Sequence, residues 1–256
     1  MIIKEFPILE FDENKDAFIN PVLVRKVLVG IDKVPSMLII CFFKEVIDQL
    51  LLKKAIEPFL TLKGENNSHY YKYVEDDILI IHGMIGGPAC GAILEEAIAL
   101  GVEKVMFCGG AGSLTKEGTC GKYVIVNSAI RDEGMSYHYK APSREIRADQ
   151  RIVDIIRKYF DENNYDYVVG KTWTTDAFYR ETTDKIALRK QEGAMIVEME
   201  QAGLLAISQF RNVAYGAILY CGDDLSKAKW DGREWSSRTS IREELVQICC
   251  KLVKKI

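Results

Sequence analysis

The chain has 256 residues, and its 48% hydrophobic and 28% charged content is typical of a folded globular protein rather than a disordered one. A formal net charge of -3 excludes the basic surplus with which polynucleotide-binding proteins neutralise phosphates, so we expect no nucleic-acid partner. No basic leader precedes an apolar stretch and no apolar run is long enough to span a bilayer, which predicts a cytoplasmic protein without a membrane anchor.

Apolar strands and amphipathic helices alternate along the chain. In chain order the pattern predicts a strand at 34–43, a helix at 44–59, a loop at 63–69, a strand at 78–81, a helix at 89–100, strands at 102–108 and 123–127, a helix at 151–160, a strand at 165–173, a helix at 197–210, a strand at 213–221 and a last helix. Gly101 suits a helix C-cap, and Ser240 with Glu243 has the spacing of a capping box. Residues 128–149 are polar and predict a loop over a site.

Strands that are apolar on both faces, separated by helices, predict an α/β fold with a central mixed sheet flanked by helices. No repeat, low-complexity tract or linker interrupts residues 1–256. We therefore expect a single domain.

The seven cysteines and three histidines form no metal-binding pattern. No two cysteines have C-x-x-C spacing, and most stand among apolar residues or glycines, where a reduced thiol behaves as a small buried group. Three histidines are few for a histidine-based metal site. The sequence therefore predicts no metal and no organic cofactor.

Glycine-rich segments follow three of the predicted strands, at 82–88, 109–113 and 222–224. Ligands of open α/β sheets bind at the carboxyl ends of strands, where backbone N–H groups can approach an anion or a sugar. Each cluster alone is equally well explained as a tight turn. Together they predict one cleft.

Two carboxylates, Glu198 and Glu200, stand at the predicted start of the helix at 197–210. Residues two apart on a helix point in different directions, so only one of them can face a given ligand. The helix dipole alone also favours acids in a first turn. The functional interpretation is a carboxylate that binds ribose hydroxyls.

The order of these motifs resembles the nucleoside phosphorylase family, which includes uridine phosphorylase, the purine nucleoside phosphorylases and the methylthioadenosine nucleosidases. The resemblance covers about 70–256 and is carried by HGMIGGPACGAILEEAIALGVEKVMFCGGAGSL, RDEGMSYHY, TTDAFYRET, VEMEQAG and GDDLS. It implies a partly parallel, barrel-like mixed sheet. It also implies active sites that borrow residues from a neighbouring subunit, hence a homo-oligomer such as a dimer or a hexamer built as a trimer of dimers.

The resemblance also implies site residues. Glu200 and Asp223 would be catalytic, the first binding the ribose hydroxyls and the second protonating the base. Substrate would further be bound by Met199 on the sugar, Glu198 at the base pocket, Phe178 stacked on the base, Gly109 and Gly110 at the phosphate or water site, and Gly86 and Arg180.

The implied chemistry follows from charge. Breaking an N-glycosidic bond builds positive charge on the ribose and negative charge on the base. A carboxylate near the sugar and a proton donor near the base therefore both stabilise the transition state. Without the resemblance, Asp223 would read as a turn residue and Phe178 as a core aromatic. Trp230 or Arg233 could close over the base.

The departures from the family concern the anion site. Family phosphorylases carry an early Gly-Asp-Pro-x-Arg loop, whereas the corresponding strand here ends in Cys41-Phe42-Phe43-Lys44, and Phe107 and Gly110 replace an Arg and a Ser or Thr. Replacement cations would be drawn from Arg131, Arg144, Arg147, Arg180 and Lys44, each more often a surface residue. FCGGAGSL is closer to the nucleosidases. The Gln and Arg with which uridine phosphorylases bind uracil are missing after Tyr179, which weakens a uracil-specific interpretation. Asp223 favours a purine base.

The leading hypothesis is phosphorolysis of a purine or uridine-type nucleoside to free base and ribose 1-phosphate, with nucleoside and phosphate as the small-molecule partners. Hydrolysis of the same bond is the nearest alternative. A nucleoside-binding protein without turnover is the third, because the phosphate loop is missing.

Overall fold

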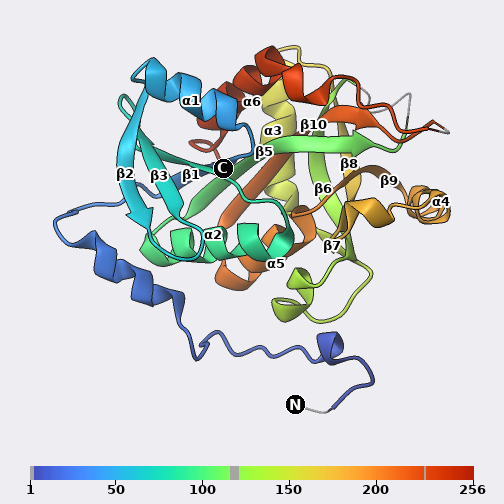
Figure 1. Cartoon of the computed structure of the whole chain (residues 1–256), viewed down its shortest axis with the longest axis horizontal. Coiled ribbons are helices and arrows are strands. Elements are labelled where there is room, and N and C mark those ends of the chain that lie inside the picture. Colours follow the sequence, from blue (N-terminus) through green and yellow to red (C-terminus); the bar gives the residue numbers. More distant parts are fainter. Residues whose placement is uncertain (1–2, 116–120, 228) are drawn as a thin grey trace.

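The structure is a computed structural model that describes residues 3–115, 121–227 and 229–256 (Figure 1). Within these residues ten strands form one mixed sheet. The strands are β1 (Met37–Cys41), β2 (Ile56–Leu62), β3 (Ser68–Tyr73), β4 (Ile78–His82), β5 (Lys104–Ser113), β6 (Tyr123–Asp132), β7 (Glu145–Arg147), β8 (Tyr167–Thr175), β9 (Ala194–Glu198) and β10 (Ala214–Asp224). The α-helices are α1 (Lys44–Leu52), α2 (Gly87–Leu100), α3 (Gln150–Glu162), α4 (Thr183–Gln191), α5 (Gln201–Arg211) and α6 (Thr239–Leu252).

The sheet closes on itself. Its order is β10-β6-β8-β9-β5-β1-β4-β3-β2, and an additional pairing of β10 with β5 joins five of the strands into a ring. Pairs β1–β5, β5–β10, β6–β8 and β8–β9 are parallel, whereas β5–β9 and β6–β10 are antiparallel. The predicted α/β class with a mixed, barrel-like sheet flanked by helices is confirmed.

Helices cover both faces of the sheet, as Figure 1 shows. Helices α2 and α5 pack on one face, where Leu38 and Ile40 of β1 point, and α1, α3 and α6 pack on the other, where Ile39 and Cys41 point. Because both faces are buried, β1 carries apolar residues at consecutive positions rather than alternate ones. This explains why the sequence showed continuous apolar runs.

The predicted helix at 44–59 is wrong beyond Leu52, because the chain turns there and enters β2. Lys54 has a φ of 54°, in the left-handed region that stops a right-handed helix. Pro58 lacks the N–H that a helix interior needs. It is instead accommodated in β2, where a register shift marks an irregularity between Pro58 and Leu60.

Three segments predicted as loops or helix continue their strands. β5 runs through the second glycine cluster to Ser113, β10 runs to Asp224, and β6 reaches Asp132 inside the predicted loop at 128–149, which also contains β7. VEME is not helical either, since β9 ends at Glu198 and α5 begins at Gln201. At the ends of β5 and β6, partner strands supply ladders on both sides, which overrides local turn preference.

Helix ends agree with the sequence in one case and not in another. Gly101 caps α2 with a φ of 118°, a left-handed conformation that glycine adopts at low cost. The predicted capping box of α6 is wrong, because the N-cap is Arg238 and no side chain caps the first turn. Leu245 and Ile248 of α6 are buried.

An arm of residues 3–35 precedes β1 and runs along the outside of the α2–α5 face (Figure 1). It contains two 3-10 helices, η1 (Pro7–Leu9) and η2 (Pro21–Leu28). Arg25 Nε donates to the Ala99 carbonyl at 2.6 Å, and Arg211 donates to the Lys15 carbonyl at 2.9 Å. These hydrogen bonds attach the arm to the ends of α2 and α5.

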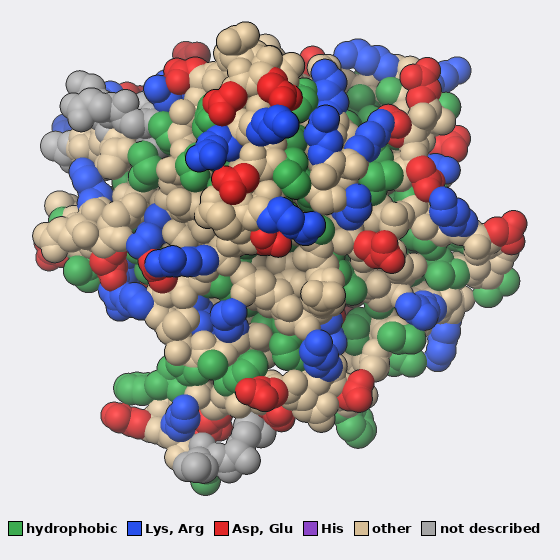
Figure 2. All heavy atoms as spheres, turned by 180° about the vertical axis from the view of Figure 1, so that it is seen from behind, with side chains coloured by type: hydrophobic (Ala, Val, Ile, Leu, Met, Phe, Trp, Pro, Cys, Tyr) green, Lys and Arg blue, Asp and Glu red, His purple; other side chains and the backbone are tan. Residues whose placement is uncertain are grey.

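No helix among the described residues has the length and apolar content that crossing a bilayer requires. Figure 2 shows Lys and Arg side chains interspersed with Asp and Glu on the face seen there, rather than gathered into one basic patch. This mixture agrees with the small net charge of the chain.

Candidate active site

Three strand segments meet at Gly112. On β5 this residue is paired with Asp223 of β10 on one side and with Val197 of β9 on the other. A Cβ atom at position 112 would lie 2.5 Å from Leu225 Cδ1 and 3.1 Å from Val197 Cγ1, so a side chain there would require Leu225 to move. The Asp223 Oδ1 atom is 3.5 Å from the same point. The tertiary structure thus brings Asp223 and the end of β9 to the same end of the sheet.

Glu200 is held by the backbone that precedes α2. Its carboxyl is buried at 6% exposure, and Oε1 accepts a hydrogen bond of 2.7 Å from the Gly86 N–H. Oε2 accepts from the Met199 N–H at 3.3 Å. Gly86 has a φ of 96°, which suits glycine and not a residue with a side chain. The first glycine cluster therefore positions the carboxyl that was predicted to bind the sugar.

Glu198 lies beneath Glu200 and is fully engaged by the protein. Its Oε1 accepts from the Thr172 and Thr174 hydroxyls at 3.1 and 2.5 Å. Its Oε2 accepts from the backbone N–H groups of Glu200 and Gln201 at 2.6 and 2.7 Å. The predicted contact between Glu198 and a base is therefore not what the structure places there. The residue instead anchors the turn that carries Glu200.

The two carboxyls influence each other's charge. Burial, and to a lesser extent the neighbouring Glu198 carboxylate, raises the pKa of Glu200 to about 8. Burial also raises the pKa of Glu198, but its four hydrogen-bond donors oppose that rise. Because all four donate to Glu198, the negative charge is favoured on Glu198 and the proton on Glu200.

Aromatic and acidic side chains gather at the other end of the site. Asp223 Oδ2 accepts a hydrogen bond of 2.7 Å from Trp230 Nε1. A two-hydrogen-bond bridge between Asp224 and Asp231 folds the following segment back and sets Trp230 in this position. Phe178 lies in the 3-10 helix η4 (Phe178–Arg180) and is 48% exposed. An exposed ring is available for stacking on a base.

Glu181 was not selected from the sequence. It is the half-buried residue in a run from Asp176 to Asp184 whose other members are exposed. Burial, and to a lesser extent the carboxylate of Asp223, raises the pKa of Glu181 to about 7. In the sequence, Glu181 stands only as one of the residues that replace the uracil-binding Gln and Arg of the family. Its residue type alone does not predict where its side chain lies.

The region of the second glycine cluster is lined by aromatic rings. The Phe42 and Phe107 rings lie 5.1 Å apart, and Phe107 is buried. A Cβ at Gly83 would lie 2.1 Å from Phe42 Cε2, and one at Gly109 would lie 2.9 Å from Phe107 Cε1. The rings thus occupy the space that these glycines leave. Gly109 is buried and its neighbour at position 110 is exposed.

The candidate cations for an anion are engaged elsewhere or exposed. Arg131 is buried and donates to the hydroxyls of Ser136 and Ser143 and to the carbonyls of Lys140 and Ala141. Its predicted role as an anion anchor is replaced by one in holding its own loop.

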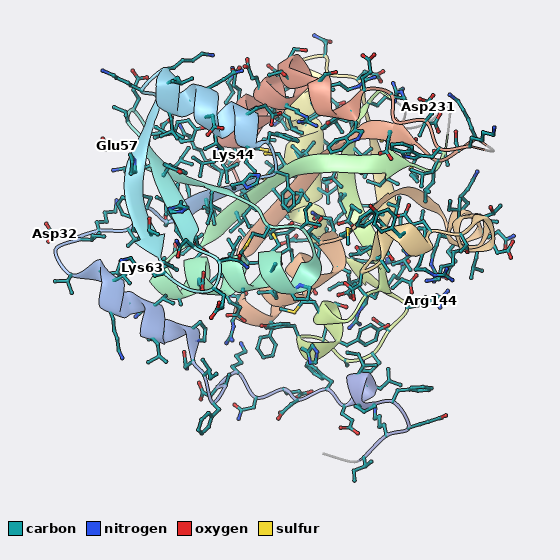
Figure 3. All side chains as sticks on the ribbon, in the orientation of Figure 1. Asp32, Lys44, Glu57, Lys63, Arg144 and Asp231 are labelled. Carbon is teal, nitrogen blue, oxygen red and sulfur yellow. The ribbon has the colours of Figure 1, made fainter. Side chains whose placement is uncertain are left out.

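Arg144 pairs with Glu192, and Lys44 pairs with Asp48. Figure 3 shows Lys44 and Arg144 at separate places on the molecule. Arg147 and Arg180 are exposed. The structure therefore does not bring the five candidates together.

The RDEGMSYHY segment supports the site from outside. Met135 packs against three glycines of α2 and α5, where Cβ atoms at Gly87, Gly91 and Gly203 would lie 3.1, 2.7 and 3.2 Å from its side chain. The Gly134 N–H donates to Asp176 at 2.8 Å. One loop thus contacts both the glycine turn that holds Glu200 and the segment that leads to Phe178.

No cluster of His, Cys, Asp and Glu among the described residues is arranged to hold a metal ion. Five of the six cysteines in the described part of the chain are buried, and Cys120 lies outside it. The Trp173 ring is fully buried, and its Nε1 donates to Asp132 at 3.0 Å.

Comparison with known proteins places the chain in a family. A sequence model described as "Phosphorylase superfamily" matches residues 36–256. Guanosine phosphorylase of Halorubrum lacusprofundi is 27% identical over 146 residues, 57% of this chain and 61% of that protein. The purine nucleoside phosphorylase of Plasmodium falciparum is 26% identical over 187 residues, 70% of this chain and 75% of the relative. The matched part thus spans about three fifths of the length of the first of these relatives.

Solved structures share the fold at lower identity. The purine nucleoside phosphorylase of Toxoplasma gondii in complex with immucillin-H is 18% identical with a TM-score of 0.70, covering 88% of this chain and 94% of that one. AMP nucleosidase of Bacteroides thetaiotaomicron is 17% identical with a TM-score of 0.71, covering 92% and 97%. Proteins named for phosphorolysis and for hydrolysis thus share this architecture.

Proposed function

The chain belongs to the phosphorylase superfamily, and we propose that it cleaves the N-glycosidic bond of a nucleoside, with water as the acceptor of the ribose. The observation that carries the cleavage is the buried Glu200 carboxyl, fixed by the Gly86 N–H at the sheet end that also carries Asp223. The observation that favours water is that the rings of Phe42 and Phe107, rather than cations, pack against Gly83 and Gly109.

The buried carboxyls suit the charge that develops on the sugar. Ribose hydroxyls that donate to Glu200 favour its ionised form, so binding of the sugar offsets the penalty of burying a second charge beside Glu198. The ionised carboxylate then stabilises the cationic sugar, an interaction that grows toward the transition state. Asp223 lies at the end of the site where the departing base gains negative charge.

The acceptor follows from polarity. A phosphate dianion needs N–H groups or cations around it, and burying it against the rings of Phe42 and Phe107 would be costly. A water molecule is small and neutral, and the cationic sugar carbon is electrophilic enough to react with it. In this proposal the C1′–N bond breaks with its electron pair on the base, which gains a proton. The water oxygen bonds to C1′ and releases a proton.

Phosphorolysis is the second candidate, because relatives named guanosine phosphorylase, purine nucleoside phosphorylase and uridine phosphorylase match the chain. In that case the anion would be bound by groups outside those described above. The same cleavage chemistry at Glu200 would apply to both acceptors.

The two candidates are separated by the product. The full chain is incubated with a panel of purine and pyrimidine nucleosides in buffer freed of phosphate and in buffer containing it. We expect free base and free ribose at the same rate in both. Ribose 1-phosphate, with turnover that disappears without phosphate, would establish phosphorolysis instead. Thermal stabilisation by a nucleoside without any base release would contradict both and indicate a binding protein.

The role of Glu200 is tested separately with Glu200→Gln, with the exposed loop variant Glu65→Gln as a control. Loss of a carboxylate that acts mainly in the transition state is expected to lower kcat by about 100- to 1000-fold. Unchanged kcat in Glu200→Gln would contradict the proposed sugar contact, whichever acceptor is used.

A further inference from the structure

We propose that Asp176 is a positioning residue for the base, because it holds the segment that carries Phe178 against the loop that follows β6. This inference rests on the proposed glycosidic cleavage and assigns a residue that sets where the base is bound. Asp176 was not selected from the sequence, because an exposed Asp directly after a strand is typical of an ordinary turn.

The first observation is the contact at the start of this segment. Asp176 directly follows β8, and its Oδ2 atom accepts a hydrogen bond of 2.8 Å from the Gly134 N–H. Phe178 stands two residues further along, at the beginning of η4. A carboxylate is a strong acceptor for a backbone N–H, so this hydrogen bond fixes the chain close to the ring.

The second observation is that the donor belongs to a well-packed loop. Within this loop the buried Glu133 carboxyl accepts a hydrogen bond of 2.9 Å from the Ser136 N–H. The Met135 side chain fills the space that three glycines of α2 and α5 leave. The residues on both sides of Gly134 are thereby held in place. Asp176 is therefore attached to a fixed point of the molecule.

The third observation is a second attachment at the far end of the segment. Arg189 of α4 is buried and donates from Nη2 to Asp132 Oδ2 at 2.9 Å. Lys185 of α4 pairs with the same oxygen at 3.4 Å, and the Trp173 Nε1 of β8 donates to it at 3.0 Å. Positions 132 and 134 therefore hold the two ends of the chain between 176 and 189.

Between these attachments the segment is exposed. Among the described residues, the backbone hydrogen bonds of η4 run within the segment, as from the Arg180 N–H to the Ala177 carbonyl at 2.8 Å. Phe178 and Tyr179 are 48% and 89% exposed, so packing contributes little to holding their rings. The position of the Phe178 ring therefore depends on where the segment is attached.

The attachment matters because an ordered ring binds a base at a lower entropy cost. A chain that is held at both ends samples fewer conformations than a chain held at one end. A ring already in place need not be ordered when the base binds, which raises the affinity. Stacking on the base contributes alike to the bound nucleoside and to its transition state. Loss of the Asp176 contact should therefore raise KM and leave kcat nearly unchanged.

The kinetic test uses the nucleoside that the full chain cleaves fastest. Asp176→Ala is expected to raise its KM about five- to tenfold, the effect of one lost hydrogen bond, with kcat within about twofold of the parent protein. Asp176→Asn should restore most of the KM, because the amide oxygen can still accept from the Gly134 N–H. Asp184→Ala, which removes an exposed carboxyl of α4, should leave both constants unchanged.

Three kinetic results would overturn the proposal. Unchanged kinetics in Asp176→Ala would show that the contact does not position the base. A lower kcat at constant KM would indicate a smaller folded fraction or a loss of chemistry instead. An Asp176→Asn variant as impaired as Asp176→Ala would show that the hydrogen bond is not the cause.

A measurement without turnover separates this inference from the proposed cleavage. The peptide bond after Arg180 lies in the exposed part of the segment, where trypsin can cut it once the chain opens locally. Under native conditions Asp176→Ala should be cut there about five- to tenfold faster than the parent protein, Asp176→Asn and Asp184→Ala, with the site identified from fragment masses. Equal rates would overturn the proposal even if nucleosides are cleaved. The expected rates without any cleavage of nucleosides would support the attachment and overturn only the proposed function.

Discussion

Glu200→Gln is expected to stabilise the folded protein at alkaline pH while it abolishes the proposed activity. The folded-state pKa of Glu200, about 8, lies above the ordinary value of 4.5. A neutral Glu200 therefore contributes its full stability below about pH 4.5, and that contribution is lost as pH rises through 8. An amide has no charge to bury, so the variant escapes this loss.

The magnitude follows from the two pKa values. Each pH unit between them is worth about 1.4 kcal/mol, so ionised Glu200 costs about 5 kcal/mol of unfolding free energy at pH 9. The side-chain oxygen of Gln can still accept a hydrogen bond from the Gly86 N–H. Its amide N–H group then faces the Met199 N–H, and this opposition of two donors costs about 1 kcal/mol of unfolding free energy at every pH. We therefore expect the variant to be slightly less stable at pH 5 and several kcal/mol more stable at pH 9.

The assay is urea unfolding at pH 5, 7 and 9 for the parent protein, Glu200→Gln and the exposed control Glu65→Gln. The difference in unfolding free energy between Glu200→Gln and the parent should change sign across this range. If the two proteins kept a constant difference from pH 5 to pH 9, the carboxyl would not be buried in a low-polarity site. The electrostatic description of the Glu198–Glu200 pair would then be refuted.

Three further predictions concern packing and the acid. Gly83→Ala places a Cβ on the Phe42 ring and should lower the unfolding free energy, measured with urea, by about 1–3 kcal/mol. Combining it with Phe42→Leu should restore most of that unfolding free energy. Met135→Ala should cost about 2–5 kcal/mol, because it leaves a cavity between α2 and α5; a loss below 1 kcal/mol would contradict that packing. Trp230→Phe removes the N–H donor to Asp223 and should lower kcat/KM about tenfold or more with little change in Tm, whereas unchanged kinetics would show that the indole contact is unimportant.

The sequence alone determined the class of fold and much of the strand and helix order. Runs such as Ile78–Ile81 and the apolar stripe of the last helix are local patterns, and burial on one or both faces follows from their period. Local patterns failed where neighbours decided the outcome. Pro58 was read as part of a helix, and the glycines of β5 were read as a loop, because partner strands were not visible in the sequence.

The sequence also selected Glu200 and Asp223, through a family resemblance, but not what surrounds them. The four donors to Glu198 come from β8 and from the turn into α5, and their convergence depends on side-chain directions across separate strands. Likewise, only the folded chain pairs Asp223 of β10 with Gly112 of β5, since the two stand far apart in the sequence. Spacing along the chain determines periodicity. Charge interactions and hydrogen bonds depend instead on distances in space, and only the tertiary structure determines those distances.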